Sequence, residues 1–149
     1  GKVYATKPLN IQGKLVEDFW FEFKDGRVVD YGASSNLASL ENLLNMDEGA
    51  KHLGEVALIS DNSPISNTKT LFYNGLIDEN ASCHLALGNC YPYNIAGGSQ
   101  MSEEELKAKG ANFSMTHCDF MFGSADLSVI GIDNQGNEVV VFENGNFVF

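Results

Sequence analysis

Basic residues are scarce in this sequence. Nine Lys and Arg stand against twenty Asp and Glu, which gives a formal net charge of −11. Because phosphate groups are bound by clustered Lys and Arg side chains, this balance argues against nucleic acid or an anionic membrane as the main partner. It fits a cytoplasmic protein or one that holds cations. No apolar run approaches about 20 residues, so we expect no segment that crosses a bilayer.

The sequence also lacks the features of a secreted, disulfide-stabilised protein. Its three cysteines, Cys83, Cys90 and Cys118, are odd in number and show no CxxC spacing. We therefore expect no disulfide framework and a reducing compartment. Residues 1–4 show no basic segment leading into an apolar one, which predicts that no secretory signal is present. There is no initiator Met, which suggests a piece of a longer protein.

Several common catalytic and nucleotide-binding motifs are missing. The sequence contains no P-loop, no G-x-G-x-x-G turn, no H-E-x-x-H and no G-x-S-x-G. Only three prolines accompany fifteen glycines, which predicts many turns rather than a low-complexity linker. Neither nucleotide binding nor a serine-hydrolase site is therefore indicated.

Length and apolar content fit one folded domain. The chain has 149 residues, of which 44% are hydrophobic and 11% aromatic, enough to fill a core. Leucines at helical spacing predict a main helix over residues 36–48, and Ser102 with Glu105 predicts a capping box on a short helix. Strands are predicted at residues 16–23, 27–31, 55–59, 81–88, 112–123, 127–132, 138–143 and 147–149. We expect an α+β fold, a single domain over residues 1–149 with a β-rich mixed or antiparallel sheet, one main helix and one short helix.

The triplet His117-Cys118-Asp119 carries the strongest chemical signal. On an extended strand, residues two apart point the same way, so His117 and Asp119 project together and Cys118 projects oppositely. An imidazole beside a carboxylate forms half of a divalent-metal site. A buried His–Asp hydrogen bond without a metal explains the same spacing equally well.

His84 and Glu55 are the next candidate ligands. His84 lies on a strand of small and apolar residues, where a lone histidine is more often a core residue than a ligand. Glu55 opens the apolar run 56–59, and a carboxylate there can bind a metal or remain a solvated strand end. Two histidines with one or two carboxylates are nevertheless a common zinc, cobalt or manganese set.

Other polar residues leave their roles open. Tyr91 could donate a hydrogen bond to a developing oxyanion or plug a loop. The pair at residues 78–79 could support a ligand or belong to a polar loop. His52 lies in a charged segment and is left out of the site. Strand alternation turns Cys83 and Cys118 away from the neighbouring imidazoles, which argues against a Cys–His nucleophilic pair.

Several segments in order resemble one known family. They are residues 53–58 (LGEVAL), 78–88 (DENASCHLALG) with Tyr91, and 117–123 (HCDFMFG), together with residues 3–9 and 47–50. These segments resemble the thermophilic-type metallo-aminopeptidases, the bacterial family called AmpS, PepS and aminopeptidase T. The resemblance covers essentially the whole chain.

The resemblance implies a function and a set of site residues. It implies that Glu55, His84, His117 and Asp119 bind two divalent cations (zinc, cobalt, manganese or magnesium). Glu55 would bridge the cations, and Tyr91 would line the active site as a second catalytic residue. The implied substrates are peptides with a free N-terminus, and the family precedent implies a homodimer.

The chain also departs from the family. The family has a further metal-binding glutamate upstream of the segment where this chain begins, and its enzymes are far longer. The chain therefore resembles a C-terminal, metal-binding portion of such an enzyme. The alternatives are a catalytically inert scaffold or oligomerisation domain, and a metal-independent binding module in which the His–Asp pair is structural.

Overall fold

Antiparallel pairing organises the fold. The computed structural model describes residues 1–149 and contains four small sheets, ordered β1-β4-β5, β2-β3, β6-β7-β8 and β11-β10-β9. The strands are β1 (Lys2–Tyr4), β2 (Leu9–Ile11), β3 (Lys14–Val16), β4 (Trp20–Lys24), β5 (Arg27–Gly32), β6 (Leu53–Ala57), β7 (His84–Gly88), β8 (His117–Met121), β9 (Val129–Ile132), β10 (Glu138–Glu143) and β11 (Asn146–Phe147). The helices are α1 (Leu37–Leu44), α2 (Pro64–Asn67), α3 (Gly75–Asp78) and α4 (Glu103–Ala108), with 3₁₀ turns η1 (Gly49–Lys51), η2 (Glu79–Ala81), η3 (Pro92–Asn94) and η4 (Gly98–Gln100). The α+β prediction is confirmed.

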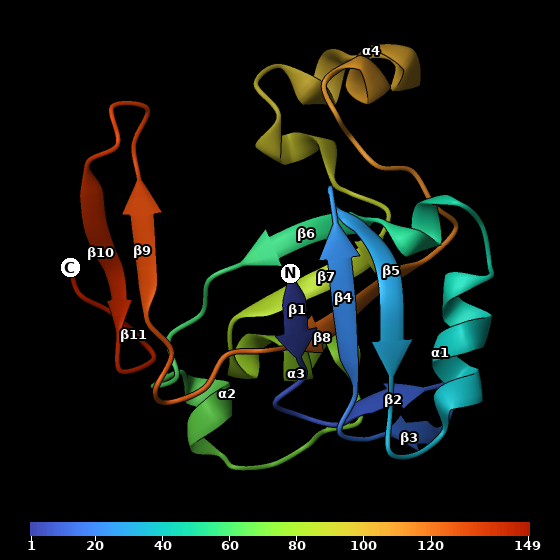
Figure 1. The fold of residues 1–149 in the computed structure, drawn as a ribbon, viewed down its shortest axis with the longest axis vertical. Coiled ribbons are helices and arrows are strands. Elements are labelled where there is room, and N and C mark those ends of the chain that lie inside the picture. The colour runs from blue at the N-terminus through green and yellow to red at the C-terminus, as the bar shows by residue number, and fades with distance from the viewer.

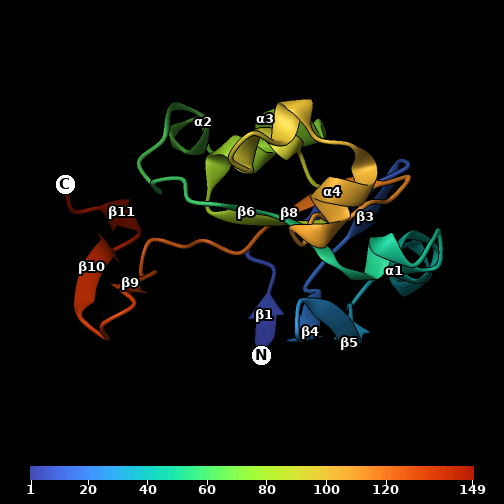
Figure 2. The ribbon, with the colours of Figure 1, turned by 90° about the horizontal axis from the view of Figure 1, so that it is seen from above.

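The sheet β6-β7-β8 lies at the centre of the molecule. In Figure 2 it is seen between the β1-β4-β5 sheet on one side and α2 and α3 on the other. Its apolar face meets the hairpin β4-β5, where the Phe120 ring lies 5.0 Å from the Phe21 ring and 5.9 Å from the Phe19 ring, centroid to centroid. Leu85 and Leu87 of β7 join the same core. The opposite face of the sheet is therefore left for polar side chains.

The hairpin β4-β5 forms at the predicted turn but begins later than predicted. Asp25 and Gly26 adopt the left-handed φ angles of +51° and +76° that a tight turn uses. The predicted strand 16–23 is interrupted because Asp18 has a φ of +46°. The chain there runs along residues 34–35, and Ser34 Oγ donates to Asp18 Oδ2 at 3.0 Å.

The main helix is shorter than predicted. The sequence pattern predicts residues 36–48, whereas α1 spans Leu37–Leu44 with Leu40, Leu43 and Leu44 buried. Beyond its end, Asp47 Oδ1 accepts a hydrogen bond from Ala50 N at 2.8 Å, which starts η1 instead of another helical turn. A carboxylate that captures backbone N–H groups competes with the helix, and periodicity alone does not show this.

The C-terminal strands, predicted at residues 127–132, 138–143 and 147–149, form β9, β10 and β11, which make a three-stranded sheet of their own. In Figure 1, β9 and β10 stand off to the left of the central sheet. The hairpin is attached by backbone bonds such as Asp61 N to Gly145 O at 2.7 Å. The other predicted short helix, α4, carries the expected capping box between Ser102 and Glu105. None of the helices has the length and apolar character that a membrane span requires.

Candidate metal centre

One face of the central sheet collects the predicted site residues. In the antiparallel register, Ala86 of β7 lies opposite Glu55 on β6 and Asp119 on β8, while Gly88 lies opposite His117. Cross-strand partners share a face, and so do residues two apart on one strand. Glu55, His84, His117 and Asp119 therefore project from the same side of three adjacent strands.

Small residues on β7 leave room between these side chains. Ala86 carries a single methyl group, and Gly88 has no side chain at all. Gly88 has a φ of +100°, and a Cβ atom there would lie 2.2 Å from Thr116 O. The close approach of β7 to the start of β8 thus requires glycine. This approach brings His117 to the cluster.

Glu55 lies between the two imidazoles. Its Oε1 is 3.3 Å from His84 Nε2, and its Oε2 is 3.5 Å from His117 Nε2. His117 Nε2 is also 3.2 Å from Asp119 Oδ1. One carboxylate therefore presents one oxygen to each histidine, which is the arrangement of a carboxylate that can bridge two cations.

The remaining imidazole nitrogens are held by backbone carbonyls. His84 Nδ1 lies 3.1 Å from Ser82 O, and His117 Nδ1 lies 2.6 Å from Asn89 O. A carbonyl only accepts hydrogen bonds, so each Nδ1 carries a proton and each Nε2 is the ring nitrogen directed at the cluster. Such carbonyl partners orient the histidine ligands of many metal sites.

The carboxylates of the cluster are not all paired with hydrogen-bond donors or cations of the protein. Asp119 Oδ1 is buried and has no hydrogen-bond partner. Burial and the negative charge of Asp119 raise the pKa of the Glu79 carboxyl above its ordinary value. Buried carboxylates without a partner are costly unless a cation accompanies them. Ligand atoms of Glu55, His84 and Asp119 all lie within 4.8 Å of one another, and this nitrogen and oxygen donor set suits zinc, cobalt or manganese.

Glu79 is a residue of the cluster that the sequence patterns did not predict. The sequence predicts that residues 78–79 form a polar loop or support a ligand. The Asp78 carboxylate accepts hydrogen bonds from Phe72 N at 2.8 Å and from Asn74 N at 2.9 Å, so it belongs to the loop. Glu79 instead belongs to the acidic end of the cluster. It begins the turn η2, where no strand or helix periodicity shows the direction of a side chain. Its position between Asp78 and the strand of His84 is the only feature of the sequence that indicates a place in the cluster.

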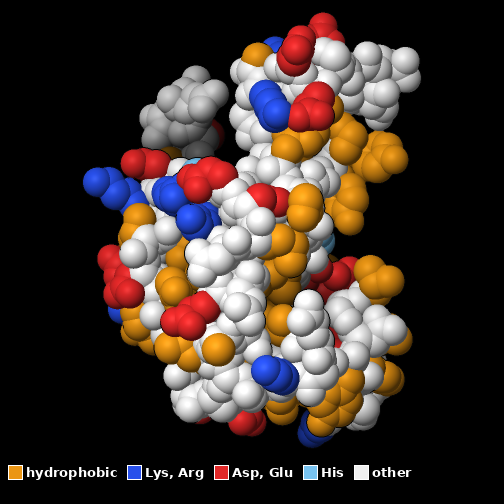
Figure 3. Space-filling view, turned by 90° about the vertical axis from the view of Figure 1, so that its right-hand side faces the viewer, with side chains coloured by type: hydrophobic (Ala, Val, Ile, Leu, Met, Phe, Trp, Pro, Cys, Tyr) orange, Lys and Arg blue, Asp and Glu red, His pale blue; other side chains and the backbone are white.

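Tyr91 borders the site. Its ring centroid lies 5.0 Å from that of His117, and about half of the residue's surface is exposed, 50%. His52, which is predicted to lie outside the site, contacts Arg27 instead, with its Nε2 3.1 Å from an Arg27 nitrogen. Figure 3 shows acidic and histidine side chains in a hollow of the surface that hydrophobic side chains border.

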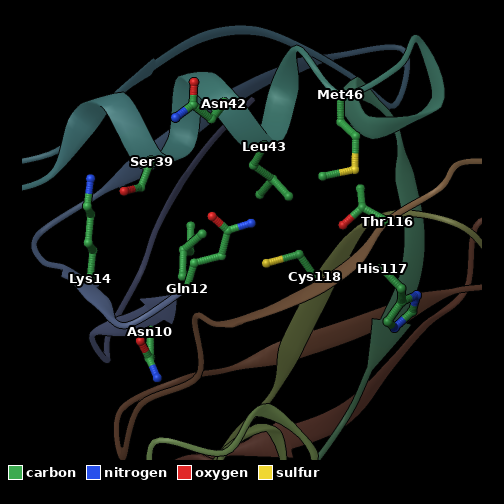
Figure 4. A pocket seen from close by; sticks show the side chains of 11 residues that line it. Asn10, Gln12, Lys14, Ser39, Asn42, Leu43, Met46, Thr116, His117 and Cys118 are labelled. Carbon is green, nitrogen blue, oxygen red and sulfur yellow. The ribbon is translucent and has the colours of Figure 1, made fainter.

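The cysteines turn away from the imidazoles, as alternation predicts. Cys83 Sγ accepts from Ile59 N at 3.3 Å. Burial raises the pKa of the Cys118 thiol to about 12, so it stays protonated. In Figure 4 the Cys118 sulfur points into a cavity of about 280 Å³ between α1 and the β2-β3 hairpin, while the His117 ring points away from it. Neither thiol is placed to act as a nucleophile with its neighbouring histidine.

Comparisons with known proteins define the class. The family model of the thermophilic metalloproteases (M29) matches residues 1–147, so the chain belongs to this metalloprotease family. It is 49% identical over 149 residues to Aminopeptidase 2 of Geobacillus stearothermophilus and 50% identical over 149 residues to Aminopeptidase AmpS of Bacillus subtilis. These matches cover 100% of the chain but 36% of each relative.

A solved structure has the same fold. Wild-type AmpT from Thermus thermophilus matches 100% of this chain with a TM-score of 0.92 and 38% sequence identity. The match covers 36% of the AmpT chain. The chain therefore spans about 36% of the length of the relatives it matches.

Proposed function

We propose that the chain is the metal-binding part of a metal-dependent aminopeptidase, which removes N-terminal residues from peptides. The observation that carries the proposal is the convergence of Glu55, His84, His117 and Asp119 on one face of the central sheet. The names of the relatives, which are aminopeptidases, support the reaction class.

The geometry of Glu55 favours two cations over one. Its oxygens are directed to different imidazoles, so that a cation beside each histidine would share the same carboxylate. Histidine donors favour zinc, cobalt or manganese over magnesium, which prefers oxygen ligands. When bound, such cations polarise a peptide carbonyl and lower the pKa of a water molecule, which makes the water a nucleophile near neutral pH.

The residues of this chain have distinct roles in the proposed reaction. His84 and His117 hold the donor atoms in place, because backbone carbonyls fix both rings. Tyr91, whose ring centroid lies 5.0 Å from that of His117, would donate through its hydroxyl to the oxyanion that forms from the peptide carbonyl. The carboxylates of Glu79 and Asp119 make the site acidic, which attracts the cationic free N-terminus of a peptide.

Hydrolysis of an aminoacyl-nitroanilide by the full-length protein tests this proposal. We expect a chelator to abolish the activity and zinc or cobalt to restore it. His117→Ala should lower kcat/KM by at least about 100-fold, because a ligand and its orientation are both lost. His52→Ala, a histidine outside the cluster, should leave kcat/KM nearly unchanged. Full activity in chelator and in His117→Ala would exclude the mechanism.

The alternative is an inert scaffold or oligomerisation domain. The resemblance implies one further metal-binding glutamate beside the four residues of this cluster, and a centre that works only with that glutamate would favour this role. Calorimetric titration of the chain with zinc separates the two proposals. Sub-micromolar binding that Glu55→Gln abolishes supports the metal centre, whereas no binding by the chain supports the scaffold.

We also propose a homodimer in the cytoplasm, with residues 1–149 as a single domain. The exposed apolar side chains of β9 and β10, Ile130, Ile132, Val139 and Val140, support self-association. The free thiols of Cys83, Cys90 and Cys118 fit a reducing compartment. One contiguous core, shared by β4-β5, α1 and the central sheet, supports a single domain.

A further inference from the structure

Asp47 makes three hydrogen bonds although it lies outside the metal cluster. Its Oδ1 accepts from Ala50 N and from Ser114 Oγ, each at 2.8 Å, and its Oδ2 accepts from Met115 N at 2.7 Å. The bonds from Met115 and Ser114 lower the pKa of the Asp47 carboxyl below its ordinary value. One carboxylate thereby ties the end of the helical segment to a chain segment 67 residues away.

The segment that Asp47 holds leads directly to His117. Ser114 Oγ, bound to Asp47, also accepts from Thr116 N at 3.1 Å. Thr116 O accepts from Asn89 N at 2.7 Å, and Asn89 O accepts from His117 Nδ1 at 2.6 Å. An unbroken series of hydrogen bonds thus connects the Asp47 carboxylate with the imidazole.

Packing leaves this connection little freedom to shift. A Cβ atom on Gly49 would lie 1.9 Å from Phe113 O, so the two backbones are in direct contact. Asn112 Nδ2 donates to Gly49 O at 2.8 Å and to Gly88 O at 2.6 Å. The segment before β8 is therefore held on one side by residues 47–50 and on the other by the end of β7.

We infer that Asp47 is a positioning residue for the metal centre: by holding residues 114–116 it keeps the Asn89 carbonyl on His117 Nδ1 and so directs His117 Nε2 toward Glu55. The inference rests on the proposed metal centre, since it assigns a role toward that site. It differs from a purely structural role in one respect. Loss of the Asp47 carboxylate should affect His117 and spare His84, which is held independently by Ser82 O.

The metal-free protein provides the first test. With ¹⁵N-labelled histidine, three imidazoles are observed, and His52→Gln and His84→Gln together assign all three. The two ring-nitrogen signals of each imidazole, recorded at about pH 9, report which nitrogen carries the proton. We expect separate protonated Nδ1 and unprotonated Nε2 signals for His117. In Asp47→Ala these two signals should move toward each other as both tautomers become populated, while the signals of His84 stay in place.

Two further variants make the test specific. Ser114→Ala removes only the hydroxyl link and should shift the His117 signals in the same direction but less far. Asp133→Ala is the matched control, because Asp133 also accepts three hydrogen bonds, from Gln135 N, Asn137 N and Asn137 Nδ2, but in the β9-β10 turn. It should leave His117 unchanged. Unchanged His117 signals in folded Asp47→Ala, or equal shifts of His84 and His117, would overturn the inference.

Cobalt binding provides the second test and separates the inference from the proposed function. We expect Asp47→Ala to weaken cobalt binding by about 10–100-fold, the usual effect of removing a residue that orients a ligand. The visible spectrum of the bound cobalt should also change, whereas Asp133→Ala should preserve both. Tight binding with an unaltered spectrum in Asp47→Ala contradicts the positioning role. If the wild-type chain binds no cobalt, the metal centre fails as proposed, and the histidine signals alone decide whether Asp47 positions His117.

Discussion

Individual carboxylates define the chemistry of the cluster. Their negative charges repel one another when no cation is bound between them. Glu79 has a raised pKa because burial and the charge of Asp119 disfavour its ionised form. A raised carboxyl pKa means that the folded state binds the proton more tightly than the unfolded state does. The stability of the metal-free protein is therefore unaffected below the ordinary pKa of Glu79, declines as the pH rises from there to its folded-state pKa, and remains lowered above it.

Replacement of Glu79 tests this balance. In the presence of chelator we expect Glu79→Gln to raise the thermal unfolding midpoint at neutral pH, because one of the repelling charges is removed. The same variant should bind zinc more weakly than wild type. Glu138→Gln, on an exposed position of β10, should change neither property. A lower unfolding midpoint for Glu79→Gln in chelator would show that the carboxylates do not repel one another.

The ligand residues could be predicted to different extents. The shared direction of His117 and Asp119 follows from strand alternation alone, and the structure shows it. That Glu55 and His84 join them depends on cross-strand register, which local sequence patterns do not give, so the residue types made them candidates and only the family resemblance assigned them to one site. Glu79 could not be placed because it projects from a 3₁₀ turn.

At the level of elements, the site depends on the register of β6, β7 and β8 and on the close approach of the β7 backbone to the start of β8. β10 has the predicted bounds, Glu138–Glu143, because its β-branched residues are flanked by clear turns. β7 begins only at His84, since residues 79–81 form η2. β8 is reduced to His117–Met121, because the residues before it are held by side chains such as Asp47 and Asn112 rather than by a neighbouring strand. Such distant contacts set element boundaries that local patterns cannot.

Gly88→Ala tests whether the approach of β7 to β8 is as tight as the structure shows. The variant combines an unfavourable φ with a contact of 2.2 Å to Thr116 O. Gly110→Ala is the matched control, since Gly110 has a φ of +91° and nothing within 4 Å of the added Cβ. We expect Gly110→Ala to cost about 1–3 kcal/mol of unfolding free energy.

Gly88→Ala should lower the unfolding free energy by clearly more than this control does. It should also weaken zinc binding, because the added methyl group displaces His117. Urea unfolding and zinc titration measure the two effects. Equal losses of stability in both variants, with unchanged zinc affinity for Gly88→Ala, would mean that the strands can separate without disturbing the site.

At the scale of the whole molecule, the central sheet divides two environments. One face, with Leu85, Leu87 and Phe120, closes the core, and the other carries the acidic cluster. The β-rich α+β class was predictable because composition and alternation indicate it. The separation of β9-β10 from the central sheet was not, since the pattern of a hairpin does not show what it packs against.

The exposed hairpin predicts self-association. Ile130 and Val140 face each other across β9-β10 and are 53% and 50% exposed. If this surface joins two copies, Ile130→Asp with Val140→Asp should convert a dimer into a monomer, because charges would be buried without partners. Val29→Asp, at a residue of β5 that is 54% exposed, is the control. Light scattering measures the mass, and a double variant that remains dimeric would exclude the hairpin as the interface.

The most direct test of the metal centre is an anomalous-scattering map from a crystal soaked in zinc. We expect density in the space enclosed by Glu55, His84, His117 and Asp119, with Glu55 shared between two peaks if both cations are bound. Zinc density only at other positions, such as His52 beside Arg27, with none beside Glu55, would contradict the proposed metal centre.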